Sequence, residues 1–131
     1  MVETHRLEDH TMSANCVKYH PNGQFLLTGS RDAHLNIYDV KGYNLIQSIP
    51  GHNFALYSIA FNANATLFAT GSRDKTAKLW NAETFEVLQR LSKDTHNAHK
   101  NSVNKVLWVD DYLVTTGDDR AILVWKEELT Y

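Results

Sequence analysis

Short segments in which apolar and polar residues alternate run along this chain, separated by turn-forming residues. Alternation with a period of two is typical of antiparallel strands that are buried on one face. In the middle of the chain it predicts four strands, at residues 56–61, 67–70, 76–80 and 85–91. No segment carries apolar residues at the 3.6-residue spacing of an amphipathic helix. The pattern therefore predicts an all-β meander without helices.

A longer pattern also returns three times in the same order. It reads TGSRDAHLNIY at residues 28–38, TGSRDKTAKLW at 70–80 and TTGDDRAILVW at 115–125. The first two copies begin 42 residues apart and the last two begin 45 apart. Self-similarity at such a period indicates an array of equivalent supersecondary units. We expect one array over residues 1–131, with repeats near 2–39, 44–81 and 86–126.

Four polar or aromatic positions recur within each repeat, and we call each set a tetrad. In every tetrad Thr precedes Asp by four residues and the aromatic residue follows Asp by six, while His precedes Asp by 22, 22 and 20 residues. The first tetrad is His10, Thr28, Asp32 and Tyr38, the second is His52, Thr70, Asp74 and Trp80, and the third is His99, Thr115, Asp119 and Trp125.

With these tetrads the sequence resembles the WD-repeat family of β-propellers over nearly its full length. The resemblance implies an all-β fold of three four-stranded antiparallel blades, similar to the C-terminal blades of a bacterial-type cytoplasmic WD-repeat protein. It also implies that each tetrad is a buried hydrogen-bond chain between strands. The residue types suit this role, because an indole N–H only donates, Thr and His donate and accept, and a carboxylate only accepts.

Some positions depart from the family's pattern. Only the second repeat keeps Gly before the tetrad His, at Gly51, whereas Asp9 and Ala98 stand there in the others. None keeps the Trp-Asp pair of the family, since Tyr38-Asp39, Trp80-Asn81 and Trp125-Lys126 occupy it. Tyr38 offers an O–H at a different reach from an indole N–H. We therefore expect the first tetrad to be the least regular.

Three blades do not close a propeller, which usually has about four to eight. The chain ends just beyond the third strand of the last repeat, and we therefore expect the last blade to lack its outer strand. Residues 2–7 precede His10 at the position where an outer strand precedes His52. We expect either a piece of a longer propeller or head-to-tail association of two or three copies. In that association, residues 2–7 of one copy complete the last blade of another.

The resemblance also implies which residues lie on the narrower "top" face of the blades. These are the residue before each tetrad Asp and those three and five after each tetrad His. They are Ser13, Asn15, Arg31, Ala55, Tyr57, Arg73, Ser102, Asn104 and Asp118. Exposed Arg beside Tyr has the composition of a protein-binding hot spot. The alternative is that Arg31 and Arg73 are solvated turn residues or pair with nearby carboxylates.

Composition and charge narrow the choice of function. The formal charge of −2 argues against a nucleic-acid binder, no apolar run is long enough to span a bilayer, and a single cysteine, Cys16, indicates a cytoplasmic location.

His96 and His99 have a spacing compatible with metal binding, but no Cys or carboxylate set completes a site, and we expect His96 in a solvated loop. We expect Cys16 to be a packed strand residue and the chain to use no cofactor or metal.

The sequence therefore predicts a non-enzymatic scaffold that binds a protein or peptide, because three copies of a His, Thr and Asp set indicate structure rather than one catalytic centre. Three alternatives remain open. One is a purely structural assembly fragment of a larger propeller, and another is an enzyme. The third is nucleic-acid binding through Arg31, Arg73, Lys75 and Lys78.

Overall fold

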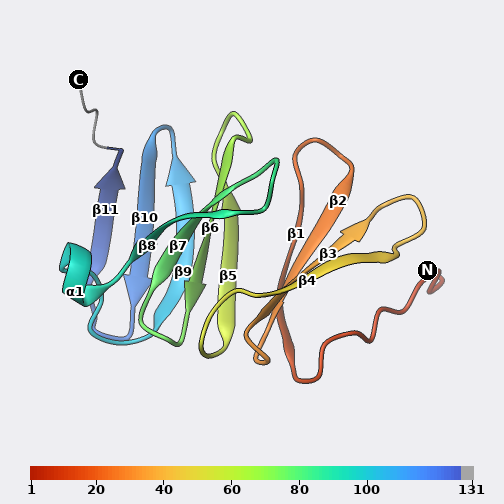
Figure 1. The fold of residues 1–131 in the computed structure, drawn as a ribbon, viewed down its shortest axis with the longest axis horizontal. Coiled ribbons are helices and arrows are strands. Elements are labelled where there is room, and N and C mark those ends of the chain that lie inside the picture. The colour runs from red at the N-terminus through yellow and green to blue at the C-terminus, as the bar shows by residue number, and fades with distance from the viewer. Residues whose placement is uncertain (128–131) are drawn as a thin grey trace.

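In the computed structural model, which describes residues 1–127, the chain forms three antiparallel sheets side by side (Figure 1). The first sheet has the order β1-β2-β3-β4 and the second has the order β5-β6-β7-β8. The strands of the first are β1 (Ala14–Tyr19), β2 (Phe25–Ser30), β3 (His34–Asp39) and β4 (Leu45–Pro50). Those of the second are β5 (Leu56–Phe61), β6 (Leu67–Ser72), β7 (Ala77–Asn81) and β8 (Val87–Leu91). The predicted all-β meander is confirmed.

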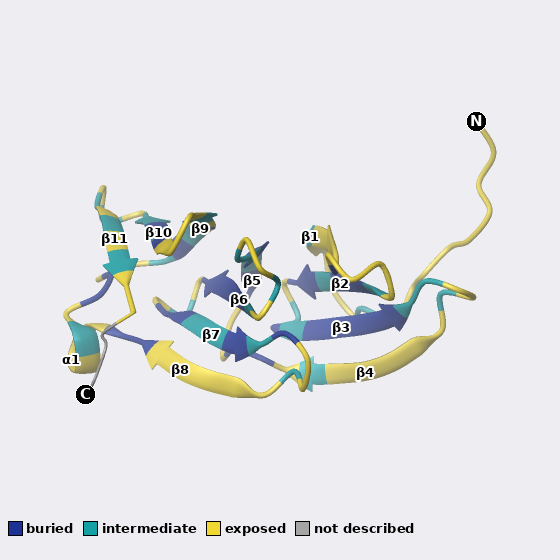
Figure 2. Ribbon diagram, turned by 90° about the horizontal axis from the view of Figure 1, so that it is seen from above, coloured by how far each residue is buried: buried dark blue, intermediate teal, exposed yellow. Residues whose placement is uncertain are grey.

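The third sheet has three strands within the described residues. They are β9 (Val103–Val109), β10 (Tyr112–Gly117) and β11 (Ile122–Lys126), and β10 pairs with both others. The third sheet therefore has no fourth strand within residues 1–127. Residues 2–7 form no strand in this chain, and they lie extended beyond the first sheet (Figure 2).

The expectation of no helix was wrong at one place, the single turn α1 (Lys93–His96) between β8 and β9. The Ser92 side chain accepts the backbone N–H of Thr95 at the start, and Asn97 ends the turn with φ 50°. Ser at an N-cap and Asn in the left-handed region are common helix end signals. A helix of four residues is too short to show an apolar stripe, so periodicity could not reveal it.

Two apolar cores hold the three sheets together. The first lies between the first and second sheets and contains Leu27, Leu35 and Ile37 against Phe68 and Trp80. The second lies between the second and third sheets. It joins small residues of the second sheet, Ala60, Ala69 and Ala77, to larger ones of the third, Val103, Val106 and Leu113. Successive residues of a strand point to opposite faces, so the second sheet contributes one face to each core.

The outermost sheet faces have no partner within residues 1–127. On the third sheet, five large apolar residues are 42–69% exposed, namely Leu107, Val109, Tyr112, Ile122 and Val124. On the first sheet, Val17 and Tyr19 are 59% and 60% exposed. We call these the open face of the third sheet and the open face of the first sheet. Strand β11 pairs with β10 in the same register as β3 pairs with β2, so Ile122 and Val124 are the counterparts of Leu35 and Ile37. In the first sheet those two residues are buried in the first core. The outer strands β4 and β8 are also largely exposed (Figure 2).

Candidate functional site

The second tetrad joins three parts of the second sheet by one hydrogen-bond chain. Trp80 Nε1 on β7 donates to Thr70 Oγ1 on β6 over 2.9 Å. Thr70 Oγ1 lies 2.7 Å from His52 Nε2, in the segment that precedes β5, and His52 Nδ1 lies 2.8 Å from Asp74 Oδ2 in the β6–β7 turn. Thr70 and Trp80 are fully buried, and the Asp74 side chain is 4% exposed.

The direction of the hydrogen bonds in this tetrad fixes the protonation state of the His52 ring. Thr70 Oγ1 already accepts the indole N–H, so its hydroxyl hydrogen is free to point at His52 Nε2. His52 is then neutral with its proton on Nδ1, where it donates to Asp74. Burial lowers the pKa of His52, although Asp74 raises it. Burial raises the pKa of Asp74, but hydrogen bonds from His52, Thr76 and Asn53 outweigh this and hold it well below its usual range.

The third tetrad repeats the arrangement. Trp125 Nε1 donates to Thr115 Oγ1 over 3.0 Å, Thr115 Oγ1 lies 2.8 Å from His99 Nε2, and His99 Nδ1 lies 3.0 Å from Asp119. Burial raises the pKa of Asp119, but the hydrogen bonds from His99 and from the Lys100 and Ala121 backbone lower it to about 2. The tetrad members of the third sheet therefore act as their counterparts do in the second.

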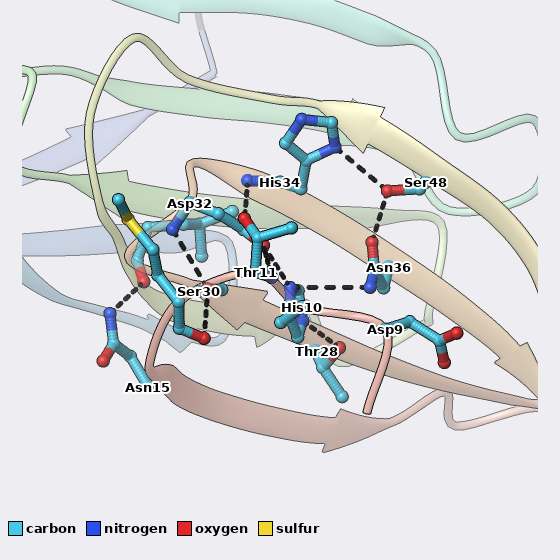
Figure 3. Close-up of polar contacts among 12 residues, drawn as sticks. Asp9, His10, Thr11, Asn15, Thr28, Ser30, Asp32, His34, Asn36 and Ser48 are labelled. Carbon is cyan, nitrogen blue, oxygen red and sulfur yellow. Dashed lines mark hydrogen bonds and ion pairs between the residues drawn. The ribbon is translucent and has the colours of Figure 1, made fainter. Parts of the chain in front are cut away.

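The first tetrad is connected differently at its aromatic member, as the sequence indicated. His10 lies 2.7 Å from Thr28 Oγ1 and 3.0 Å from Asp32 Oδ2 (Figure 3), but the Tyr38 hydroxyl donates to Asp9 over 2.9 Å. Asp9 stands where the second repeat has Gly51, and a Cβ at Gly51 would lie 3.3 Å from the Trp80 ring. The small residue leaves room for an indole, whereas Asp9 supplies an acceptor for the shorter phenol.

The polar side chains of the tetrads bond to one another inside the sheets. In the second and third, both ring nitrogens of the His are engaged inside the sheet. Two surface cavities, of about 280 and 520 Å³, have no tetrad residue in their lining. The tetrads instead tie the turn at one end of each sheet to its central strands, because Asp32, Asp74 and Asp119 also accept backbone N–H groups there.

The family model described as "WD domain, G-beta repeat" matches residues 1–39, 43–81 and 91–126. The chain belongs to the WD-repeat family. Two solved structures, "Structure of U3-55K" and "Crystal structure of RRP9 WD40 repeats", are each similar over 92% of this chain, with a TM-score of 0.83 and 21% identity. The chain covers 38% and 37% of their lengths, so it spans less than two-fifths of either. No curated protein matches the sequence.

In WD-repeat terms, the three sheets are propeller blades, and the predicted top-face residues gather at one end of them, the lower edge in Figure 1. Each residue before a tetrad Asp is bonded to the residue three after a tetrad His. The backbone N–H of Arg31 donates to Ser13 O, that of Arg73 to Ala55 O and that of Asp118 to Ser102 O. The predicted pairs therefore lie together, once per blade.

The residues five after each tetrad His lie at irregularities of the inner strands. Asn15, Tyr57 and Asn104 fall where the strand register shifts, and such bulges redirect a side chain. Asn15 reaches the next blade and donates to Leu56 O over 3.2 Å, and Asn104 donates to Asp118 over 2.7 Å. The family resemblance indicated these three positions, and the structure adds that the backbone is irregular at each of them.

The Ala55 side chain does not lie at the surface as predicted, and four exposed residues at this end of the blades were not predicted there, namely Met12, Phe54, Lys75 and Asn101. Ala55 is buried, at 4% exposure, so its side chain cannot reach a partner. Phe54, beside it, is 58% exposed and lies in the lining of the 280 Å³ cavity with Lys75 and Asn101. Phe54 and Asn101 each lie two after a tetrad His, as does exposed Met12, so the repeat spacing could have identified them.

Two other predicted residues have plain structural roles. His96 lies in α1 rather than in an irregular loop, with its ring 6.3 Å from that of Trp125. No cluster of three potential metal ligands occurs in the described part of the chain. Cys16 packs on β1 beside the first core, where burial raises the pKa of its thiol to about 11. Within residues 1–127, the single helix α1 is neither long nor apolar enough to cross a membrane.

Proposed function

We propose that this WD-repeat chain is a non-enzymatic scaffold that binds a protein or peptide partner across its top face. WD repeats indicate a protein-interaction kind of function. The observation that supports this placement is the row of exposed side chains held by rigid turns at one end of the blades. Arg31, Arg73, Met12 and Phe54 are exposed there, beside half-buried Tyr57. Rigid blades allow such loop residues to vary while the fold is kept.

Charge reversal at the top face tests this placement. Arg73→Glu combined with Tyr57→Ala should leave the circular dichroism spectrum and the unfolding midpoint near those of the unmodified chain, because Arg73 is exposed and has no ion-pair partner among residues 1–127. The same variant should no longer capture the partner that the unmodified chain retains from lysate, as identified by mass spectrometry. Lys41→Glu, in the exposed β3–β4 turn, is the control with the same change of charge. Equal capture by the double variant and the unmodified chain would disprove the top-face assignment.

Completion of the propeller is a second part of the proposal. The open faces of the first and third sheets are equivalent to faces that are covered inside the chain, so each has the form of half a blade interface. We propose that copies associate head to tail, with residues 2–7 of one copy pairing with β11 of another. The alternative is that a longer chain supplies the missing blades. We further propose a cytoplasmic location, since the one cysteine makes no disulfide in this chain.

A further inference from the structure

A small cavity opens on the top face where the second blade meets the third. Its volume is about 280 Å³. Its lining consists of Phe54, Arg73, Lys75, Asn101, Ser102 and Asp118. Ligand pockets usually occupy about 300–1,000 Å³. This cavity therefore suits one or two side chains of a partner better than a cofactor.

Positive charge in the cavity is available to a ligand. Arg73 and Lys75 project from the β6–β7 turn, and neither makes an ion pair with any carboxylate of residues 1–127. The turn itself is fixed, because the Arg73 backbone N–H donates to Ala55 O and Ser102 Oγ donates to Arg73 O. Arginine and lysine held in this way pair well with a carboxylate.

An apolar surface and a single carboxylate complete the cavity. The Arg73 guanidinium lies 6.0 Å from the centre of the Phe54 ring, which is 58% exposed. Asp118 accepts the Asn104 amide over 2.7 Å and keeps one negative charge in the lining. That charge opposes a doubly charged phosphate more strongly than a singly charged carboxylate. The net charge of the chain, −2, also opposes a polyanion.

We propose that this cavity binds an Asp or Glu side chain of a partner peptide, with an apolar neighbour of that residue packed on Phe54. The inference rests on the proposed function, because it assigns a ligand chemistry to the same face. Arg73 and Lys75 pair with the carboxylate, Asn101 donates its amide, and Phe54 covers the adjacent apolar group. A peptide without an acidic residue leaves Arg73 and Lys75 without a carboxylate partner. This difference in binding is what favours a peptide that carries Asp or Glu.

A display selection with peptides of random sequence tests the inference. Twelve-residue peptides are selected on the unmodified chain, and the most enriched peptide is labelled with fluorescein for anisotropy measurements. We expect enriched peptides to share Asp or Glu beside an aromatic or aliphatic residue. Replacing that acidic residue by Gln or Asn, or using the Arg73→Glu chain, should weaken binding by about tenfold or more. Phe54→Ala should weaken it without altering charge, whereas Lys41→Glu should leave it within about twofold.

Every other outcome contradicts either the inference or the proposed function. A consensus without a carboxylate, no consensus at all, or equal binding by the Arg73→Glu chain would overturn it. Tighter, strongly salt-dependent binding of a twelve-nucleotide oligouridylate would point to nucleic acid instead. If the acidic consensus fails while Arg73→Glu with Tyr57→Ala still abolishes partner capture, the proposed function stands without this ligand chemistry. If the consensus appears but capture is unaffected, the top-face function fails.

Discussion

Asp74→Ala is expected to lower the free energy of unfolding by about 3 kcal/mol, because donors on the two buried residues His52 and Thr76 lose their acceptor together. The carboxylate accepts from His52 Nδ1 and from the backbone N–H of Asn53 and of Thr76. Its side chain is 4% exposed, so water cannot replace it without opening the turn. Each buried donor that is left unpaired costs about 1–3 kcal/mol. Urea unfolding followed by circular dichroism measures the change.

Asp111→Ala is the matched control for this prediction. Asp111 lies in the exposed β9–β10 turn, and its removal changes the net charge by the same amount. We expect its effect on the free energy of unfolding to stay within about 0.5 kcal/mol. A loss below about 1 kcal/mol for Asp74→Ala would mean that the tetrad contributes little to the stability of the blade.

Light scattering should give a particle mass of about 30 kDa, twice the 15.0 kDa of one chain, if two copies close a propeller. Two copies give six blades, within the usual range of about four to eight, whereas three copies give nine. Val124→Glu should reduce the particle to 15.0 kDa, because it places a carboxylate on the open face of the third sheet, where Val124 is 63% exposed in one chain. A well-folded unmodified chain at 15.0 kDa would contradict self-assembly.

Mixing two variants distinguishes a head-to-tail interface from a symmetric one. Val17→Glu alters the open face of the first sheet, and Val124→Glu alters that of the third. In a head-to-tail arrangement each variant keeps one intact face, so a mixture should form dimers of about 30 kDa although each alone does not. A mixture that stays at 15.0 kDa would exclude pairing between these two faces.

The sequence predicted what repeats and missed what occurs once. The tetrad spacing predicted nearly every hydrogen bond of the three tetrads, because the same set of residue types recurs at nearly the same spacing in each repeat. The exception, Tyr38, follows from Asp9, and the two residues become a donor and acceptor pair only in three dimensions. The single turn α1 depends on the local caps Ser92 and Asn97, which carry no periodicity.

The top face was predicted less completely than the blades. The family resemblance implied that Arg73 and Tyr57 lie near the blade ends, but whether a side chain is exposed depends on its neighbours in the folded chain. Ala55 is covered, while Phe54 beside it is open and flanks Arg73. Residues far apart in sequence, such as Phe54 and Asp118, meet in one cavity only because the second and third blades pack together.

The protonation of the His52 ring tests the central claim most directly, namely that a chain of hydrogen bonds from Trp80 to Asp74 holds the strands of the second blade together. Nitrogen-15 chemical shifts of labelled protein report which ring nitrogen carries the proton. We predict a neutral ring with its proton on Nδ1 that persists below pH 6.5, because burial lowers the pKa of His52. A ring protonated on Nε2, or one that titrates like a histidine in water, would contradict the account.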